Sequence, residues 1–177
     1  MNDIVMRYLK KSATKFDVKI EPWLAKEMRR HKEPLFKMVR ETERTQREHG
    51  TLLTFKPGWF WNKTELSPIV VGSEGAVAVR YPENKEPLLF IHTHTQGYMN
   101  KVPSFFDLHD TFRRGFPYAA GIGTMSERGP SINVYMIKTR NGSIPALTEN
   151  IIRRGNESKY EKNVHKIWDL VRLREHR

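Results

Sequence analysis

The feature that most constrains the fold is an apolar run that ends in two histidines. Leu88 to Ile91 is apolar, and His92-Thr93-His94 follows directly. A short apolar run bounded by turn residues is typical of a buried strand. Because side chains alternate along a strand, His92 and His94 project from the same face. Two neighbouring imidazoles can bind one metal ion, so we expect a metal site at the end of this strand.

A helix start further along the chain offers a third ligand. Ser104 opens a segment that we expect to be helical as far as Arg114, and Asp107 lies one turn after Ser104 on the same face. A chain that returns to the end of the strand would bring Asp107 to the two histidines. Two histidines and one carboxylate leave one tetrahedral position of zinc open for water, as in catalytic sites.

Each of these features also has a purely structural interpretation. A His-x-His pair can be two polar residues on a solvated face. Ser104 and Asp107 also match a capping box, in which a hydroxyl and a carboxylate bind the free amides of a helix start. These alternatives stay open at this point. The order and spacing of the signals favour one shared site, and no second His-x-His pair occurs in the chain.

The pattern His92-x-His94, then a loop, then Ser104-x-x-Asp107 resembles the motif of the JAMM (MPN+, JAB domain) zinc metalloproteases. Members of that family cleave peptide or isopeptide bonds after ubiquitin-like modifiers. The family also places a glutamate on an early strand beside the metal. Glu48, followed by Gly50 and an apolar stretch, is similar to that segment. The resemblance covers residues 15 to about 140.

The resemblance implies a role for each residue. His92, His94 and Asp107 would bind Zn²⁺, and Glu48 would act as the general base. Ser104 would hold the attacking water or donate to the developing oxyanion. The implied activity is that of a zinc metallo(iso)peptidase, with ubiquitin-like protein conjugates or peptides as substrates.

Two departures from the family pattern define the alternative hypothesis. Thr95 stands where family members usually have proline, and nine residues, 95–103, separate His94 from Ser104 where seven are usual. A degraded site, kept as a binding or scaffold module, is compatible with both departures. His109 and Asp110 either orient the ligands or lie at the surface. We expect His49 to point to the other face of its strand.

The composition limits the chemistry that the chain can use. Its 177 residues predict one domain, and it contains no cysteine. Disulfides, thiolate ligands and a cysteine nucleophile are therefore excluded, and any metal must use histidines and carboxylates. The lack of cysteine also fits a reducing cytoplasm. We expect a cytoplasmic protein, because the sequence shows neither a signal peptide nor a membrane-spanning run.

The chain is strongly basic, with a net charge of +11 and a pI of about 9.9. Such a charge favours an acidic protein partner or a nucleic acid. Nucleic-acid association, of the kind a RadC-like protein would show, is a third hypothesis. The basic residues are spread along the chain, so a generally basic protein without such a partner is equally compatible.

The predicted elements favour an α/β (α+β) fold with a mixed β-sheet flanked by helices. The resemblance implies an MPN/JAB-like, cytidine-deaminase-like architecture, with a core at about 15–140 and an amphipathic C-terminal helix at about 158–174. That helix either packs on the domain or binds a partner, and the aromatic cluster at 59–61 lines a groove or covers the core. We expect strands at 16–20, 51–55, 68–71, 76–81, 88–94, 118–125 and 132–137, and helices at 22–46 (interrupted at Pro34) and 104–114.

Overall fold

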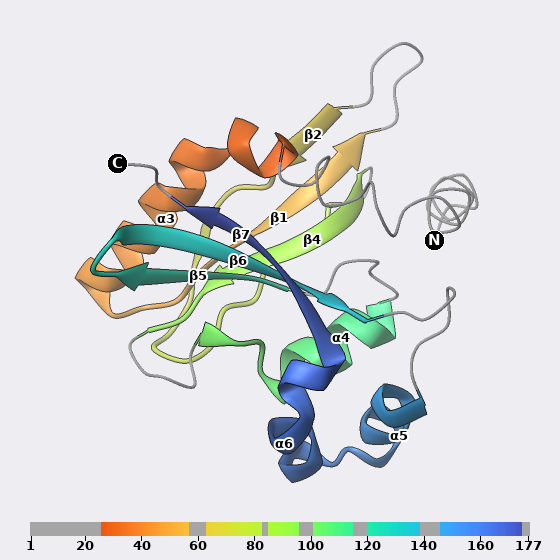
Figure 1. Ribbon diagram of the computed structural model, residues 1–177. Coiled ribbons are helices and arrows are strands. Elements are labelled where there is room, and N and C mark those ends of the chain that lie inside the picture. Colours follow the sequence, from red (N-terminus) through yellow and green to blue (C-terminus); the bar gives the residue numbers. More distant parts are fainter. Residues whose placement is uncertain are drawn as a thin grey trace.

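The computed structural model describes residues 26–56, 63–82, 85–95, 101–114, 120–138 and 146–174. Within them, a mixed, open, seven-stranded sheet has the order β2-β1-β4-β5-β6-β7, with β3 also paired to β1 (Figure 1). The β4–β5 pair is parallel, and the other pairs are antiparallel. The strands are β1 (His49–Lys56), β2 (Lys63–Leu66), β3 (Val70–Val71), β4 (Glu86–Thr93), β5 (Ala120–Ser126), β6 (Gly129–Ile137) and β7 (Trp168–Arg174).

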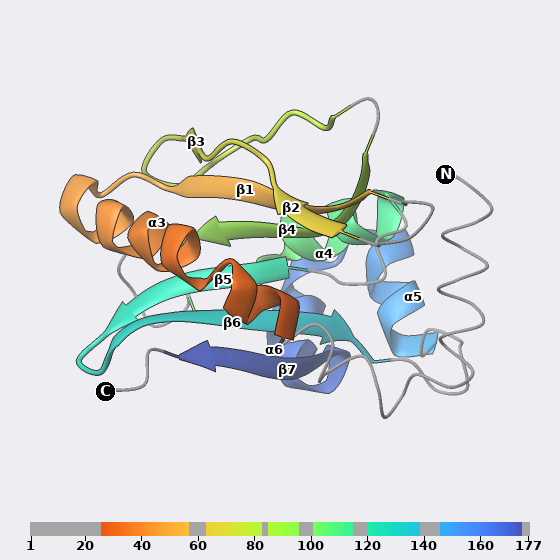
Figure 2. The same cartoon turned by 90° about the horizontal axis from the view of Figure 1, so that it is seen from above.

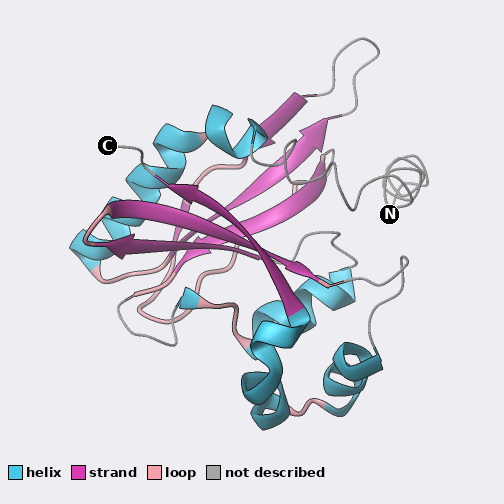
Figure 3. Cartoon of the chain, in the orientation of Figure 1, coloured by secondary structure: helices cyan, strands magenta, loops and turns pink. Residues whose placement is uncertain are grey.

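Helices flank this sheet on both faces. One of them lies across the inner strands on one face, and three gather on the other face (Figures 1 and 2). Among the described residues, α3 (Lys32–Thr45) lies on the first face, and α4 (Phe105–Arg114), α5 (Ala146–Arg154) and α6 (Glu157–Ile167) lie on the other. The predicted mixed sheet flanked by helices is therefore confirmed, as Figure 3 shows by element type.

The sheet separates two apolar layers, and alternation along β6 shows how. Ile132 and Val134 belong to the layer under α3, whereas Tyr135 and Ile137 belong to the layer shared with α4, α5 and α6. The α3 layer also contains Leu53, Leu89 and Ile91 from β1 and β4. The predicted strand over 132–137, with Tyr135 and Ile137 on one face, is confirmed.

Two glycines of β5 allow close packing on the α3 side of the sheet. A Cβ atom added to Gly123 would lie 2.8 Å from Val39 Cγ2 and 2.9 Å from Thr93 Cγ2. One added to Gly121 would lie 3.0 Å from Ile91 Cγ1. The strand expected at 118–125 is observed as β5 over the described residues 120–126. The strand pairs with β4, and these glycines face α3 rather than the histidine pair.

The helical prediction for 22–46 is confirmed over the described residues 26–45, but the interruption lies at His31 and not at Pro34. Residues 26–30 are helical, a turn occurs at His31, and α3 then extends to Thr45. Pro34 lies in the first turn of α3, where its missing N–H removes no helical hydrogen bond. Gln46 ends the helix in the left-handed conformation (φ 53°), and its N–H binds Thr42 O.

The C-terminal prediction needs a correction. A helix was expected over 158–174, but α6 ends at Ile167 and the next seven residues form β7. This strand pairs with β6 from Ile137↔Trp168 to Ser131↔Arg174. The predicted packing of the helix on the domain is confirmed, because Tyr160, Val164 and Ile167 are buried.

The predictions of strands at 68–71 and 76–81 are wrong except at Val70 and Val71. Only Val70 and Val71 form a strand, and residues 76–81 pair with none of the described strands. The segment instead covers Gly50, whose added Cβ atom would lie 3.0 Å from Val79 and 3.1 Å from Val77. Strand β2 and helix α5 were not predicted.

Several predictions fall elsewhere in the chain. The predicted strand at 16–20 and the aromatic cluster at 59–61 lie outside the described residues. In the part of the chain that the structure describes, no helix is long and apolar enough to cross a bilayer.

Candidate metal centre

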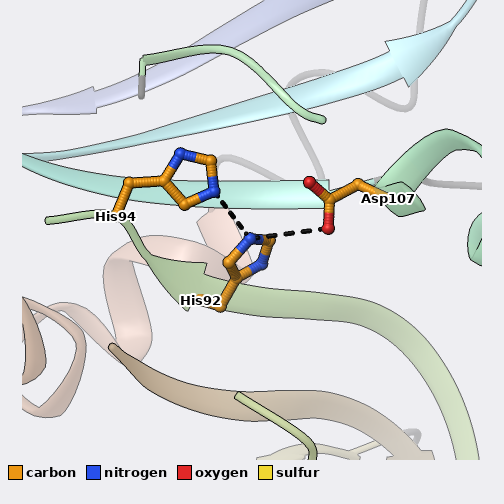
Figure 4. Close-up of side chains that lie close together, drawn as sticks. All are labelled: His92, His94 and Asp107. Atoms are coloured by element: carbon orange, nitrogen blue, oxygen red, sulfur yellow. Dashed lines mark hydrogen bonds and ion pairs between the residues drawn. The ribbon is translucent and has the colours of Figure 1, made fainter. Parts of the chain in front are cut away.

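The two histidines lie at the end of a central strand. Within β4, His92 pairs with Gly50 of β1 on one side and Ile122 of β5 on the other. Its side chain is only 4% exposed. His94 follows two residues later on the same face, and the Nε2 atoms of the two rings are 2.9 Å apart (Figure 4). The predicted side-by-side arrangement of the imidazoles is confirmed.

Asp107 approaches the same point from helix α4. Its Oδ1 atom is 3.5 Å from His92 Nε2 (Figure 4). The ligand-type atoms of His92, His94 and Asp107 all lie within 4.8 Å of one another, so this group could hold a metal ion. The three residues come from two elements that are separate in sequence, which means that folding assembles the group.

Asp107 also forms the capping box that the sequence allowed. Its Oδ2 atom accepts hydrogen bonds from Ser104 N and Ser104 Oγ, each at 2.7 Å, and its own N–H donates to Ser104 Oγ at 3.2 Å. The two interpretations are therefore compatible, because Oδ2 closes the cap and Oδ1 faces the histidines. The cap fixes the carboxylate in one orientation.

His92 is held by stacking rather than by a second hydrogen bond. Its ring stacks on Phe90 with centroids 4.8 Å apart and planes 15° apart. Its buried Nδ1 atom has no hydrogen-bond partner among the described residues. Burial lowers the pKa of His92, and the nearby charge of Asp107 opposes that shift in part. A neutral imidazole is the form that binds metals.

Glu48 lies directly before β1 and is buried, with 8% of its surface exposed. Its backbone is fixed by Glu48 N to Ser73 O and Gly72 N to Glu48 O, both at 2.7 Å. Burial raises the pKa of Glu48 to about 7, and the negative charge of Asp107 adds to the effect. The Glu48 carboxylate is therefore not fully solvated.

Alternation places Glu48 on the side of the histidine pair. It lies two residues before Gly50, the residue that pairs with His92, so both positions share one face of the sheet. The effect of Asp107 on its pKa also indicates that the two carboxylates are close. In the described part of the chain, no hydrogen bond to the Glu48 carboxylate occurs. A buried acid without a partner is typical of functional sites.

His49 points to the opposite face, as predicted. Its Nδ1 atom lies 2.8 Å from Thr42 Oγ1 and 2.9 Å from Arg47 O. Thr93, between the two ligand-type histidines, faces the same way, and its hydroxyl accepts from His49 N at 2.8 Å. We call Thr42, His49 and Thr93 the buried polar cluster. It ties α3 to the strand ends that carry the candidate site.

The remaining predicted residues are less central. His109 is exposed on α4 and contacts the Phe105 ring, with centroids 6.3 Å apart. Asp110 is half-buried. Thr95 Oγ1 donates to Glu74 O at 2.9 Å, which brings the chain after His94 to the 72–75 loop. Residues 96–100 of the long loop lie outside the described part.

Sequence analysis missed two contributors to this centre. Phe90 stacks on His92, and its position two residues earlier on the same strand was a usable signal. Nothing in the sequence indicated that residues 76–79 cover Gly50, because this contact depends on the conformation of a loop.

Comparisons with family models, with curated proteins and with solved structures found no match to this chain.

Proposed function

We propose that this protein is a zinc-dependent hydrolase of peptide or isopeptide bonds. The observation that carries the proposal is the meeting of His92, His94 and Asp107, with the unpartnered carboxylate of Glu48 on the same side of the sheet. Tetrahedral zinc with ligands at 2.0–2.1 Å separates them by about 3.3 Å. The N···N distance of 2.9 Å and the N···O distance of 3.5 Å lie on either side of that value.

The donor set also fits a catalytic zinc rather than a structural one. Three protein ligands leave a fourth position for water, whereas closed structural sites use four. A zinc ion bound here would lower the pKa of a bound water molecule to near 7. The residues around it would then carry out the proton transfers.

Glu48 is the general base in this proposal. It takes a proton from the attacking water, and the water oxygen adds to the carbonyl carbon. When the C–N bond breaks, Glu48 returns that proton to the leaving amine. A carboxylate with a pKa of about 7 is suited to both transfers near neutral pH.

Ser104 has a less direct part. We predicted that its hydroxyl holds water or donates to the oxyanion, but its proton is directed to Asp107 Oδ2 at 2.7 Å. The catalytic role stays a prediction, and it requires the hydroxyl to change its hydrogen-bond partner. Meanwhile, the observed bond holds the carboxylate toward the histidines.

The substrate class rests on the resemblance to the JAMM family. We propose an MPN/JAB-like architecture and substrates in which a ubiquitin-like tail is joined to an amine. The net charge of +11 favours an acidic partner by electrostatic steering. Nucleic-acid association through basic side chains stays a prediction, as does a cytoplasmic location.

Elemental analysis of the wild type beside His92→Ala tests the metal centre. We expect one equivalent of zinc in wild-type protein that has met no chelator, and its loss in the variant. A matched His49→Ala variant removes a histidine that is equally buried but faces away, and it should keep the metal. Wild-type protein without bound zinc after zinc addition would refute the proposal.

The hydrolytic step needs a separate test on zinc-loaded protein. Glu48→Gln keeps the size of the side chain but cannot accept the proton. It should keep the metal and lose at least about 100-fold in cleavage of modifier fusions, in line with general acid–base contributions. Zinc-loaded wild type that cleaves none of a panel of peptide and isopeptide conjugates would favour the scaffold hypothesis.

A further inference from the structure

Two buried tyrosines hold the backbone that leads into helix α4. Tyr160 of α6 donates a hydrogen bond to Pro103 O at 2.5 Å. Tyr135 of β6 donates one to Lys101 O, also at 2.5 Å. Both carbonyl groups belong to the short segment just before Ser104, where the capping box of Asp107 begins. The C-terminal part of the chain is therefore joined to the start of the site helix.

The hydroxyl of Tyr160 is itself fixed from the other side. Trp168 Nε1 donates to it at 2.9 Å, so the hydroxyl accepts one hydrogen bond and donates the other. Tyr160 is 3% exposed and Trp168 5% exposed. Burial raises the pKa of Tyr160, which keeps the donor proton in place. An unmade hydrogen bond at such a buried position destabilises the folded state.

Ring packing extends the restraint into α4. Phe105, the first residue of that helix, meets the Tyr160 ring edge-on with centroids 5.9 Å apart. Leu108 is fully buried in the same layer. Asp107 lies between these two packed residues in the sequence and is half-buried.

A capping box alone cannot place Asp107 at the histidines. The box fixes the carboxylate relative to Ser104, which is on the same segment. The position of that segment relative to β4 depends on contacts with other elements, and the direct ones are those of Tyr160, Tyr135 and the α4 core residues. The 3.5 Å gap between Asp107 Oδ1 and His92 Nε2 is therefore sensitive to them.

We propose that Tyr160, oriented by Trp168, is a positioning residue that sets Asp107 against the histidine pair and so raises the metal affinity of the centre. This inference rests on the proposed zinc site. It gives the C-terminal helix and strand a role beyond core packing. The hydroxyl, rather than the ring, carries that role, so removal of one oxygen atom tests it.

The test compares zinc affinities of purified full-length variants by competition with a chelating indicator. Tyr160→Phe keeps the ring and removes the hydroxyl, and we expect zinc affinity to fall by about 10–100-fold, as when a group that supports a ligand is lost. Val164→Ala is the matched control, because Val164 lies on the same helix and in the same core layer. It should destabilise the fold with less than about a threefold change in zinc affinity.

A double-mutant cycle shows whether the effect passes through Asp107. In an Asp107→Ala background, Tyr160→Phe should change zinc affinity by less than about threefold, since the ligand it positions is gone. The Co²⁺-substituted protein gives an independent readout. Tyr160→Phe should shift its visible absorption toward that of Asp107→Ala, whereas Val164→Ala should keep the wild-type spectrum.

The possible results separate the two proposals. Wild-type protein that does not bind zinc refutes the metal centre, and this inference with it. Wild type that binds zinc while Tyr160→Phe matches Val164→Ala refutes only the positioning role, as does an equal loss with and without Asp107. If Tyr160→Phe does not fold, Tyr135→Phe is used instead. It removes the hydrogen bond to Lys101 O, the other tyrosine bond to the segment before Ser104, and zinc affinity should fall by about threefold to tenfold.

Discussion

His49 and His92 are a natural comparison, because they lie on neighbouring strands, one position apart in register, and face opposite sides of the sheet. Both are buried, at 6% and 4% exposure. Nδ1 of His49 has two hydrogen-bond partners, whereas Nδ1 of His92 has none among the described residues. His92 instead directs Nε2 toward His94 and Asp107.

The difference gives a criterion for choosing candidate ligand residues among histidines of equal burial. On the α3 side, the buried polar cluster satisfies its groups internally, as stable cores do. On the α4 side, the buried Nδ1 atom of His92 has no partner among the described residues, which costs stability unless something else binds there. We therefore expect substitutions on the α3 side to affect folding stability, and substitutions on the α4 side to affect ligand binding.

The largest expected effect is stabilisation by zinc. A ligand at 1,000 times its Kd adds about 4 kcal/mol to the free energy of unfolding. At roughly 2–4 °C per kcal/mol for a chain of this size, Tm should rise by about 8–16 °C. His92→Ala should abolish the rise and His49→Ala should retain it, as measured by calorimetry with and without zinc. If zinc changes the Tm of both variants equally, the proposed difference between the two faces of the sheet is wrong.

The next effect concerns the buried polar cluster. Thr93→Val keeps the shape of the side chain but takes away the acceptor of His49 N and the partner of Thr42 Oγ1. Such unmade hydrogen bonds cost about 1–3 kcal/mol, which urea unfolding of the metal-free protein would measure. Thr54→Val, which removes one bond to Glu65 O, is the control and should cost about 1 kcal/mol. A change of zinc stoichiometry in Thr93→Val would show that this cluster is not purely structural.

A smaller effect is a pH dependence that comes from Glu48. Its pKa is raised from 4.5 to about 7 in the folded protein, so the folded state binds the proton more tightly than the unfolded state. Metal-free stability should therefore fall as pH rises from about 4.5 to 7. The full shift corresponds to about 3 kcal/mol, and solvent screening reduces it to roughly 1–2 kcal/mol.

Glu48→Gln isolates that contribution, because His92 has the opposite tendency. The lowered pKa of His92 makes stability fall as pH drops below 6.5. The difference in unfolding free energy between wild type and Glu48→Gln cancels this term. A difference that stays constant between pH 4.5 and 7 would mean that Glu48 is solvated and outside the centre.

The smallest effect should come from His109. It lies two residues after Asp107, but it is exposed and packs on the Phe105 ring. His109→Ala should change zinc affinity by less than about twofold, against the 10–100-fold typical of a group that orients a ligand. A larger loss of zinc affinity, measured by competition with the chelating indicator, would show that His109 orients a ligand.

The sequence predicted much of the centre because its signals are local. Alternation along one strand was enough to place His92 and His94 together, and helix-start chemistry was enough to orient Asp107. The same reasoning sent His49 to the other face. Burial of Glu48 was not predicted, because the 72–73 backbone that binds Glu48 comes from a loop whose path the sequence left open.

The errors share one cause. The apolar spacing of Tyr160, Val164, Ile167 and Trp168 is helical, and it gave no sign that the helix ends at Ile167. Residues from Trp168 onward form β7 because the edge of β6 offers a row of unpaired backbone groups. The strands expected at 68–71 and 76–81 were wrong for the same kind of reason, because β1 pairs only with Val70 and Val71 in this segment.

By itself, the sequence determined the chemistry of this protein: which residues can bind a metal, which faces of strands and helices they occupy, and that no thiol takes part. Only the tertiary structure decided which of those residues meet, which polar atoms are left without partners, and where a helix becomes a strand. Alternation and capping act over a few bonds, so they can be read along the chain. Burial and strand pairing depend on surfaces that exist only after distant segments have come together.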